Sequence, residues 1–325
     1  MAYPTGLRVH EHLPAGHRLP VVVLVHGALD RAASFARTVR RLDGMAVVTY
    51  DRRGYGGSGP GGPPTSLAGH VDDLLGVVDH VIDQVVGGRV AGGVAGSKVA
   101  GGVASSKATG SGVTAVDGRV VAVGHSLGGD VVLAAALARP DRFASVGAFE
   151  PPMPWLGFRN PNRPAGAGRW PPDGADPAAE AERFFRRIVG QAAWDRLPDR
   201  ARQARRAEGP ALVADLAALR GPAPLDVTRL AVPAVFGSGG PASQPHHRQT
   251  VDWLATHVPG AERFDVDAAG HGAHLSHPDA FAAFVRAVVA RAPAAGAATA
   301  RTPATAATAG ATGVAMPAGG EESGT

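Results

Sequence analysis

A five-residue segment, Gly-His-Ser-Leu-Gly at residues 124–128, constrains the fold of this chain more than any other feature. The apolar, β-branched run before it, residues 120–123, predicts a buried strand. The Ala- and Leu-rich residues 127–138 predict a helix that ends before Pro140. A strand, a tight turn and a helix in this order form a nucleophile elbow, in which the turn lifts the Ser126 hydroxyl above the sheet. The alternative is that Ser126 only caps the helix.

Predicted strands and helices alternate along most of the chain. This alternation predicts an α/β fold with a mostly parallel central sheet and helices on both of its faces. The predicted strands span residues 7–12, 21–25, 46–50, 120–123, 145–149, 234–236 and 263–266. The predicted helices span residues 31–42, 67–86, 127–138, 244–257 and 278–290.

Two segments lack the pattern of a folded element. Residues 87–118 form a near-repetitive Gly/Ala/Val/Ser tract within what should be a short helix-to-strand connection, and we interpret them as a flexible insertion. Residues 293–325 are rich in Ala, Thr, Pro and Gly without apolar periodicity, which predicts a disordered tail.

A third segment, residues 151–224, differs in kind. It opens with a Pro-rich loop and continues with two helical patterns, at 178–189 and 198–219. Because it lies between two strands, we expect it to form a small helical lid over the carboxyl edge of the sheet. The core then comprises residues 1–150 and 225–292.

Composition excludes several other classes of protein. The chain contains no cysteine, which excludes a disulfide framework, a thiolate metal site and a cysteine nucleophile. Its first six residues carry no basic region, and its longest early apolar run, residues 21–25, is too short to span a bilayer. These features predict a soluble, cytoplasmic protein without a membrane span.

The net charge of +4 does not point to a nucleic-acid partner. Eight arginines lie between residues 183 and 206, but acidic residues are interleaved with them. This mixture is typical of a solvated helical face, whereas nucleic-acid binding favours a purely basic stripe with exposed aromatic residues.

The segment His-Gly-Ala at residues 26–28 follows the predicted strand 21–25. A serine that transfers an acyl group needs two N–H donors directed at the developing oxyanion. The N–H of Leu127, directly after Ser126, is one candidate, and the N–H of Ala28 is the other. His26 is expected to brace this loop in preference to transferring a proton, and it is also a candidate substrate-binding residue.

A catalytic serine also needs a base and a carboxylate. His271, within the Gly-His-Gly loop after the strand 263–266, is the candidate base among 13 histidines. The turn after the strand 234–236 contains no acidic residue. Glu150, at the end of the strand 145–149, is therefore the predicted third member, with Asp267 as the alternative.

Four motifs resemble those of the α/β-hydrolase superfamily and follow the order of that family. They are His-Gly at 26–27, Asp-Arg-Arg-Gly-Tyr-Gly-Gly-Ser at 51–58, Gly-His-Ser-Leu-Gly-Gly at 124–129 and Gly-His at 270–271. The resemblance covers most of the chain outside the insertion and the tail. It implies the α/β-hydrolase fold and an activity similar to that of esterases and lipases.

The chain departs from the family pattern in the position of its acid. Some branches, haloalkane dehalogenases among them, carry the acid after the strand that follows the nucleophile, which resembles Glu150. Those enzymes use an aspartate nucleophile, so Ser126 argues against dehalogenation.

Residues 54–59 also fit the dinucleotide-binding pattern Gly-x-Gly-x-x-Gly. That pattern requires a helix directly after it, and Pro60, Pro63 and Pro64 interrupt the chain there. We interpret this loop as a structural turn and expect no dinucleotide.

These patterns predict a serine hydrolase that cleaves a carboxylic ester or a related acyl compound, such as a thioester or lactone, without a metal or organic cofactor. Trp155 and Phe158, with Trp170, open the expected lid as candidate substrate-binding residues and suggest a partly apolar small molecule. A hydrolase of carbon–carbon bonds or a cofactor-free perhydrolase would use the same triad. A non-catalytic ligand-binding protein of the same fold is the remaining alternative.

Overall fold

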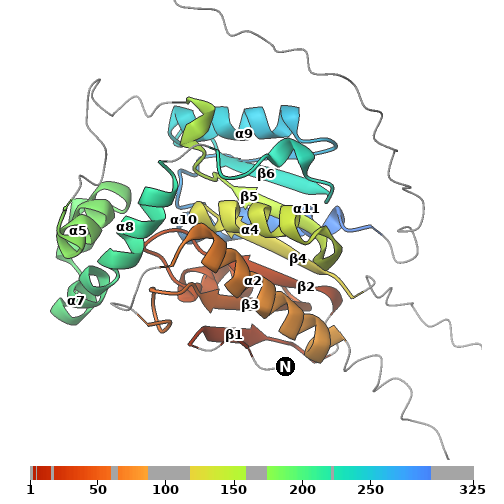
Figure 1. Ribbon diagram of the computed structural model, residues 1–325, viewed down its shortest axis with the longest axis horizontal. Coiled ribbons are helices and arrows are strands. Elements are labelled where there is room, and N and C mark those ends of the chain that lie inside the picture. Colours follow the sequence, from red (N-terminus) through yellow and green to blue (C-terminus); the bar gives the residue numbers. More distant parts are fainter. Residues whose placement is uncertain are drawn as a thin grey trace, which may run out of the picture.

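The centre of the computed structural model is a seven-stranded sheet with helices on both faces (Figure 1). The structure describes residues 3–4, 6–15, 18–59, 65–86, 118–158, 174–220 and 223–293. Of the predicted insertion, only Gly118 lies within the described residues, and of the predicted tail, only Pro293 does. The candidate residue Trp170 lies outside them.

The strands follow the order β1-β3-β2-β4-β5-β6-β7 across the sheet. Only the pairing of β1 with β3 is antiparallel. The strands are β1 (Arg8–His12), β2 (Arg18–Val25), β3 (Met45–Asp51), β4 (Val120–His125), β5 (Phe143–Phe149), β6 (Ala234–Gly239) and β7 (Glu262–Val266). All seven strands were predicted. β6 extends to Gly239 because residues 237–239, predicted as a turn, continue to pair with β7.

Helices cover both faces of the sheet. The main helices are α1 (Ala36–Val39), α2 (Leu67–Val81), α4 (Leu127–Ala138), α9 (Pro245–His257), α10 (Ala273–Ser276) and α11 (Pro278–Ala290). Apolar residues of α2, α4 and α9 pack on one face, and those of α11 pack on the other. The strand β2 contributes Val21, Val23 and Val25 to the first face and Val22 and Leu24 to the second. Burial on both faces explains why the strand is a continuous apolar run.

Four helices, α5 (Pro177–Ile188), α6 (Gln191–Asp195), α7 (Asp199–Ala207) and α8 (Gly209–Ala218), come from the segment expected to be a lid. Figure 1 shows α5, α7 and α8 grouped beside one end of the sheet. Phe185, Trp194 and Leu212 of this group form a small apolar cluster with Leu29 and Tyr55 of the core.

Two helix predictions were wrong in detail. The predicted helix 198–219 is divided into α7 and α8, because Pro210 lacks an N–H and cannot continue the helical hydrogen bonds. A Cβ on the preceding Gly209 would lie only 2.1 Å from the carbonyl oxygen of Pro177, so a glycine is needed for the close approach of α8 to α5. The predicted helix 31–42 is a 3₁₀ turn, η1 (Ala32–Phe35), followed by the short α1. The Ala32 N–H at its start donates to Asp51 Oδ1 (2.8 Å).

The helix α4 carries a carboxyl group in the core. The side chain of Asp130 is fully buried, and neither of its oxygens has a hydrogen-bond partner among the described residues. Burial raises the pKa of Asp130 well above the usual value, and the nearby charge of Arg52 lowers it only in part. Burial therefore favours the protonated form of this carboxyl in the folded protein.

We expect Asp130→Asn to stabilise the protein at pH 8. Above the ordinary carboxyl pKa the unfolded chain loses this proton while the folded chain keeps it, so ionisation favours unfolding. The gain should be larger at pH 8 than at pH 4, because the unfolded carboxyl is ionised at pH 8 and partly protonated at pH 4. Urea unfolding of both proteins at pH 4 and pH 8 measures this difference. Equal gains at the two pH values would contradict the assignment of a neutral carboxyl.

Candidate active site

Ser126 lies between β4 and α4 in a strained backbone conformation, with φ 52° and ψ −131°. Its side chain makes no capping hydrogen bond to α4. The geometry therefore favours the elbow over the helix-cap interpretation. Among the described residues, Ser126 makes no side-chain hydrogen bond to His271; such catalytic contacts often tighten only when substrate binds.

Close backbone packing forces the tight turn at Ser126. A Cβ on Gly124 would lie 2.1 Å from the carbonyl oxygen of Gly128, and one on Gly128 would lie 2.2 Å from that of Val25. A Cβ on Gly27 would lie 2.9 Å from the Cβ of Ser126. The glycines thus let the elbow pack directly against the end of β2, which brings the 26–28 loop beside Ser126.

Backbone strain is concentrated along this edge of the sheet. Among the described residues, the non-glycine residues with positive φ are Leu29, Ser126, Glu150 and Ala268. They follow the carboxyl ends of β2, β4, β5 and β7. Each such conformation costs about 1–3 kcal/mol and persists only where its surroundings enforce it.

Glu150 and His271 meet at the same edge. Glu150 is fully buried, and its Oε2 lies 2.8 Å from His271 Nδ1. Its Oε1 accepts hydrogen bonds from the Gly239 N–H (2.7 Å) and from the hydroxyl of Ser243. Burial, the largest influence, raises the pKa of Glu150, but the hydrogen bonds from His271, Ser243 and Gly239 together lower it below the usual value. The carboxylate form is therefore favoured.

Sequence reasoning missed Ser243. It lies after β6, at the turn where an acid was expected, and it donates to the acid on the neighbouring strand instead. The alternative acid, Asp267, is exposed and makes no side-chain hydrogen bond to His271 among the described residues. The one sequence signal for Ser243 is its place in a turn that lacks a carboxylate.

Other histidines surround His271. The Nε2 of His125 lies 2.7 Å from the carbonyl oxygen of His271 and donates to it, since a carbonyl only accepts. The ring of His247 stacks on that of His271, with centroids 4.5 Å apart. These contacts hold the loop and the ring of His271 from two sides.

The two oxyanion candidates are the N–H of Leu127, directly after Ser126, and that of Ala28, directly after Gly27, which approaches Ser126 closely. Ala28 is half-buried, and Leu127 opens α4; neither N–H has a partner among the described residues. His26 has no exposed surface, and its Nε2 accepts the Arg52 N–H (2.8 Å) while its Nδ1 lies 2.7 Å from the Gly27 carbonyl oxygen. This placement fits the bracing role of His26 better than contact with a substrate.

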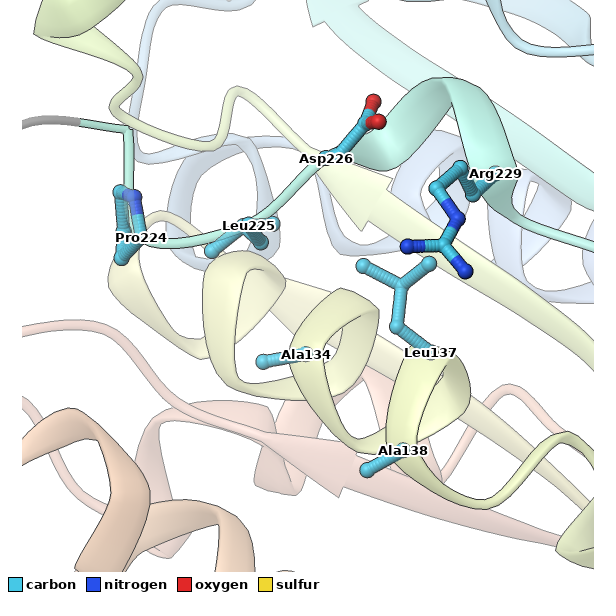
Figure 2. Close-up of a pocket in the computed structure, with 7 residues that line it drawn as sticks. All are labelled: Ala134, Leu137, Ala138, Pro224, Leu225, Asp226 and Arg229. Carbon is cyan, nitrogen blue, oxygen red and sulfur yellow. The ribbon is translucent and has the colours of Figure 1, made fainter.

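Two aromatic candidates from the start of the expected lid, Trp155 and Phe158, lie within the described residues. Trp155, in the turn η4 (Pro154–Leu156), packs against the core and lines a hollow of about 220 Å³ together with Trp253. A neighbouring hollow of about 380 Å³ lies over the end of α4 (Figure 2). Neither lining includes Ser126 or His271. Phe158 is half-buried.

Two groups of described residues have ligand atoms close enough to share a metal ion. One is Asp30, His125 and His274; the other is Glu150, His247 and His271. In each group a hydrogen bond already joins a histidine to the carboxylate, at 3.1 Å for His274 and Asp30. That the protein works without a metal ion or an organic cofactor stays a prediction.

Comparison with known proteins gives the family. Residues 22–284 match the family model described as the alpha/beta hydrolase family. The chain belongs to this family. No curated protein matches the sequence significantly. No helix in the described part of the chain is both long and apolar enough to cross a membrane.

The fold is similar to those of several solved hydrolases. A hydrolase from Pseudomonas aeruginosa gives a TM-score of 0.59 at 19% identity, covering 87% of this chain and 94% of the other. An enol-lactonase from Burkholderia xenovorans gives 0.57 at 19% identity, covering 87% and 96%. A thermophilic esterase from Thermogutta terrifontis gives 0.55 at 18% identity, covering 88% and 93%. At such low identities these likenesses show the fold alone.

Three buried histidines, His26, His70 and His125, favour the neutral form. Burial is the largest influence in each case: it lowers the pKa of His26 to about 4, that of His125 well below the usual value, and that of His70 as well. Between pH 6.5 and 4 the unfolded chain therefore binds protons that the folded chain does not. The buried Asp130 acts in the opposite sense, but a single carboxyl is outweighed by three imidazoles.

We expect the free energy of unfolding to fall as the pH is lowered from 7 to 4.5. The loss should be roughly 2–3 kcal/mol for His26 alone, since each pKa unit is worth about 1.4 kcal/mol. Urea titrations at half-unit pH steps measure it. His70→Gln should flatten the pH dependence, whereas His10→Gln, at an exposed position of β1, should leave it unchanged. A stability that is constant or rises over this range would contradict the account.

Proposed function

We propose that the protein is a serine hydrolase that cleaves a carboxylic ester, or a related thioester or lactone, through an acyl-enzyme on Ser126. The observation that carries this proposal is the hydrogen bond between buried Glu150 and His271 at the edge where Ser126 is strained. Membership of the alpha/beta hydrolase family supports it. An enol-lactonase and an esterase among proteins of similar fold agree with acyl chemistry.

In the first half-reaction, His271 Nε2 accepts the hydroxyl proton of Ser126 as the serine oxygen bonds to the substrate carbonyl carbon. Glu150 keeps the Nδ1 of His271 protonated and stabilises the imidazolium that forms. The N–H groups of Ala28 and Leu127 stabilise the oxyanion. His271 then gives its proton to the leaving alcohol, thiol or lactone oxygen, and the carbonyl re-forms as the acyl-enzyme.

In the second half-reaction, His271 takes a proton from a water molecule, and the hydroxide attacks the acyl-enzyme. A second oxyanion forms between the same two N–H groups. His271 returns the proton to the oxygen of Ser126 as the bond to the acyl group breaks, which releases a carboxylic acid and restores the serine.

We also propose that helices α5–α8 act as a cap beside this site. Phe185, Trp194 and Leu212 belong to the same apolar cluster as Leu29, which supports this role, since Leu29 directly follows the oxyanion candidate Ala28. A cap in this position would shape the entrance for the acyl or alcohol part of the substrate.

Covalent labelling tests the nucleophile. We expect a fluorophosphonate probe to add one phosphonyl group per chain, at Ser126, and Ser126→Ala to lose both the labelling and the hydrolysis of p-nitrophenyl acetate. Intact-mass and peptide mass spectrometry measure the adduct. An intact, folded protein that neither labels nor hydrolyses any ester of a short-chain panel would instead favour a ligand-binding role.

Two matched amide substitutions test the acid. We expect Glu150→Gln to reduce kcat by on the order of 10³–10⁴, because the amide no longer holds the required tautomer of His271. Asp267→Asn, at an exposed position, should keep kcat within about threefold of wild type, as surface substitutions usually do. Stopped-flow or plate kinetics with p-nitrophenyl butyrate measure both. The reverse pattern would transfer the role to Asp267.

A further inference from the structure

A buried arginine joins the oxyanion loop to the helical segment. Arg52 directly follows β3, and its side chain is fully buried. Its Nε donates to the carbonyl oxygen of His26 and its Nη2 to that of Gly27, each at 3.0 Å. One guanidinium therefore holds two consecutive carbonyl groups of the loop that ends in Ala28.

The carbonyl of Gly27 and the N–H of Ala28 belong to one planar peptide group. In a trans peptide these two groups point in opposite directions. Holding the Gly27 carbonyl on Arg52 therefore turns the Ala28 N–H away from Arg52. The close approach of Gly27 to Ser126, where a Cβ would lie 2.9 Å from the serine Cβ, keeps this peptide at the nucleophile.

His26 adds a second donor to the same carbonyl. Its Nε2 accepts the backbone N–H of Arg52, so the proton of the neutral ring is on Nδ1, which donates to the Gly27 oxygen (2.7 Å). Two donors on one carbonyl polarise the peptide, and polarised hydrogen bonds strengthen one another. The Ala28 N–H thus becomes a stronger donor as well as an oriented one.

The charge of Arg52 is balanced from the helical segment. Asp215 of α8 is buried, and its Oδ2 accepts from Arg52 Nη2 at 2.8 Å, across 163 positions of sequence. It also accepts from the Tyr55 hydroxyl (2.6 Å) and contacts His70 Nε2 (3.1 Å). A buried guanidinium without a partner is strongly destabilised, so the position of Arg52 depends on this carboxylate.

We propose that Asp215 and Arg52 are positioning residues for the oxyanion hole: α8 holds the guanidinium that orients the Gly27–Ala28 peptide toward the oxygen of the reacting carbonyl. The inference rests on the proposed serine hydrolase function. In this proposal the helical segment has two roles: it caps the site, and through Asp215 it helps to orient the Ala28 N–H. An ion pair that only anchors α8 would leave the oxyanion hole unaffected.

A second buried carboxylate of the same segment serves as a matched control. Glu208, just before α8, pairs with Arg31 (2.7 Å) and accepts from the Gly56 N–H (3.0 Å). It also pairs with Arg205, which donates to the carbonyl oxygen of Leu29 (3.1 Å), but neither side chain makes a hydrogen bond to His26 or Gly27 among the described residues. Asp215→Asn and Glu208→Gln therefore each weaken the attachment of the helical segment, but only the first weakens the hold on the Gly27 carbonyl.

The test compares turnover with the binding of an oxyanion mimic. In an aryl trifluoromethyl ketone, the oxygen of Ser126 adds to the carbonyl carbon, its proton moves to His271, and the ketone oxygen becomes an alkoxide in the oxyanion hole. We expect Asp215→Asn to lower kcat for p-nitrophenyl acetate about tenfold to a hundredfold, less than the loss of a whole donor. The inhibition constant of the ketone should rise by a similar factor, while KM changes little. Glu208→Gln should leave kcat and the inhibition constant within about threefold of wild type at an equal or larger loss of Tm.

Arg52→Lys keeps the charge but replaces the planar fork of donors with a single ammonium group, which cannot reproduce the fixed geometry toward both carbonyls, so it should reproduce the kinetic defect of Asp215→Asn. Tyr55→Phe removes one hydrogen bond to Asp215 without changing a charge, and should give a smaller defect of the same kind. This variant replaces Asp215→Asn if the latter does not fold.

Folded Arg52→Lys and Tyr55→Phe proteins with wild-type kcat and ketone affinity would overturn the proposal. So would parallel losses in Asp215→Asn and Glu208→Gln. If the fluorophosphonate probe does not label Ser126 of the wild-type protein, the proposed hydrolase function itself is overturned.

Discussion

The close packing of the elbow against the end of β2 is the constraint on which the site depends. Glycines at 27, 124 and 128 leave no room for a Cβ, so the β4–α4 turn and the loop after β2 meet at backbone distance. This contact accompanies the strained conformation of Ser126 and brings the loop that contains Gly27 and Ala28 next to the elbow. The parallel sheet then brings the ends of β5 and β7 to the same edge.

The proposed acid, Glu150, lies on the strand next to the one after which the family pattern places this residue. Glu150 ends β5, beside the β6 strand whose following turn lacks a carboxylate. That turn supplies hydrogen-bond donors instead, the Gly239 N–H and the Ser243 hydroxyl, and they stabilise the charged form of Glu150. One carboxylate oxygen of Glu150 thus contacts His271, and the other accepts hydrogen bonds from Gly239 and Ser243. In the helical segment, Asp215 pairs with Arg52, which donates to the carbonyls of His26 and Gly27 beside the proposed oxyanion donor Ala28.

The sequence predicted those parts of the molecule that have local signals. Strands such as β2 are buried on both faces and appear as uninterrupted apolar runs, and the Gly-x-Ser-x-Gly segment carries its own strand and helix. The break at Gly209–Pro210 was missed because residues that favour helices, mainly Ala, Arg and Leu, lie on both sides of it. The contacts of Ser243 with Glu150 and of Asp215 with Arg52 join residues 93 and 163 positions apart, and no local pattern marks such partners. Trp155 was expected near the substrate from residue type alone, and its contacts are with the core and Trp253.

The most direct measurement of the central claim is a crystal structure of the protein after reaction with a fluorophosphonate. The proposed arrangement requires a covalent bond from Ser126 to phosphorus, with the phosphoryl oxygen about 2.7–3.1 Å from the backbone nitrogens of both Ala28 and Leu127. The Gly27 carbonyl should still contact Arg52, and His271 should still contact Glu150. An adduct on another residue, or a phosphoryl oxygen turned away from both nitrogens, would contradict this account.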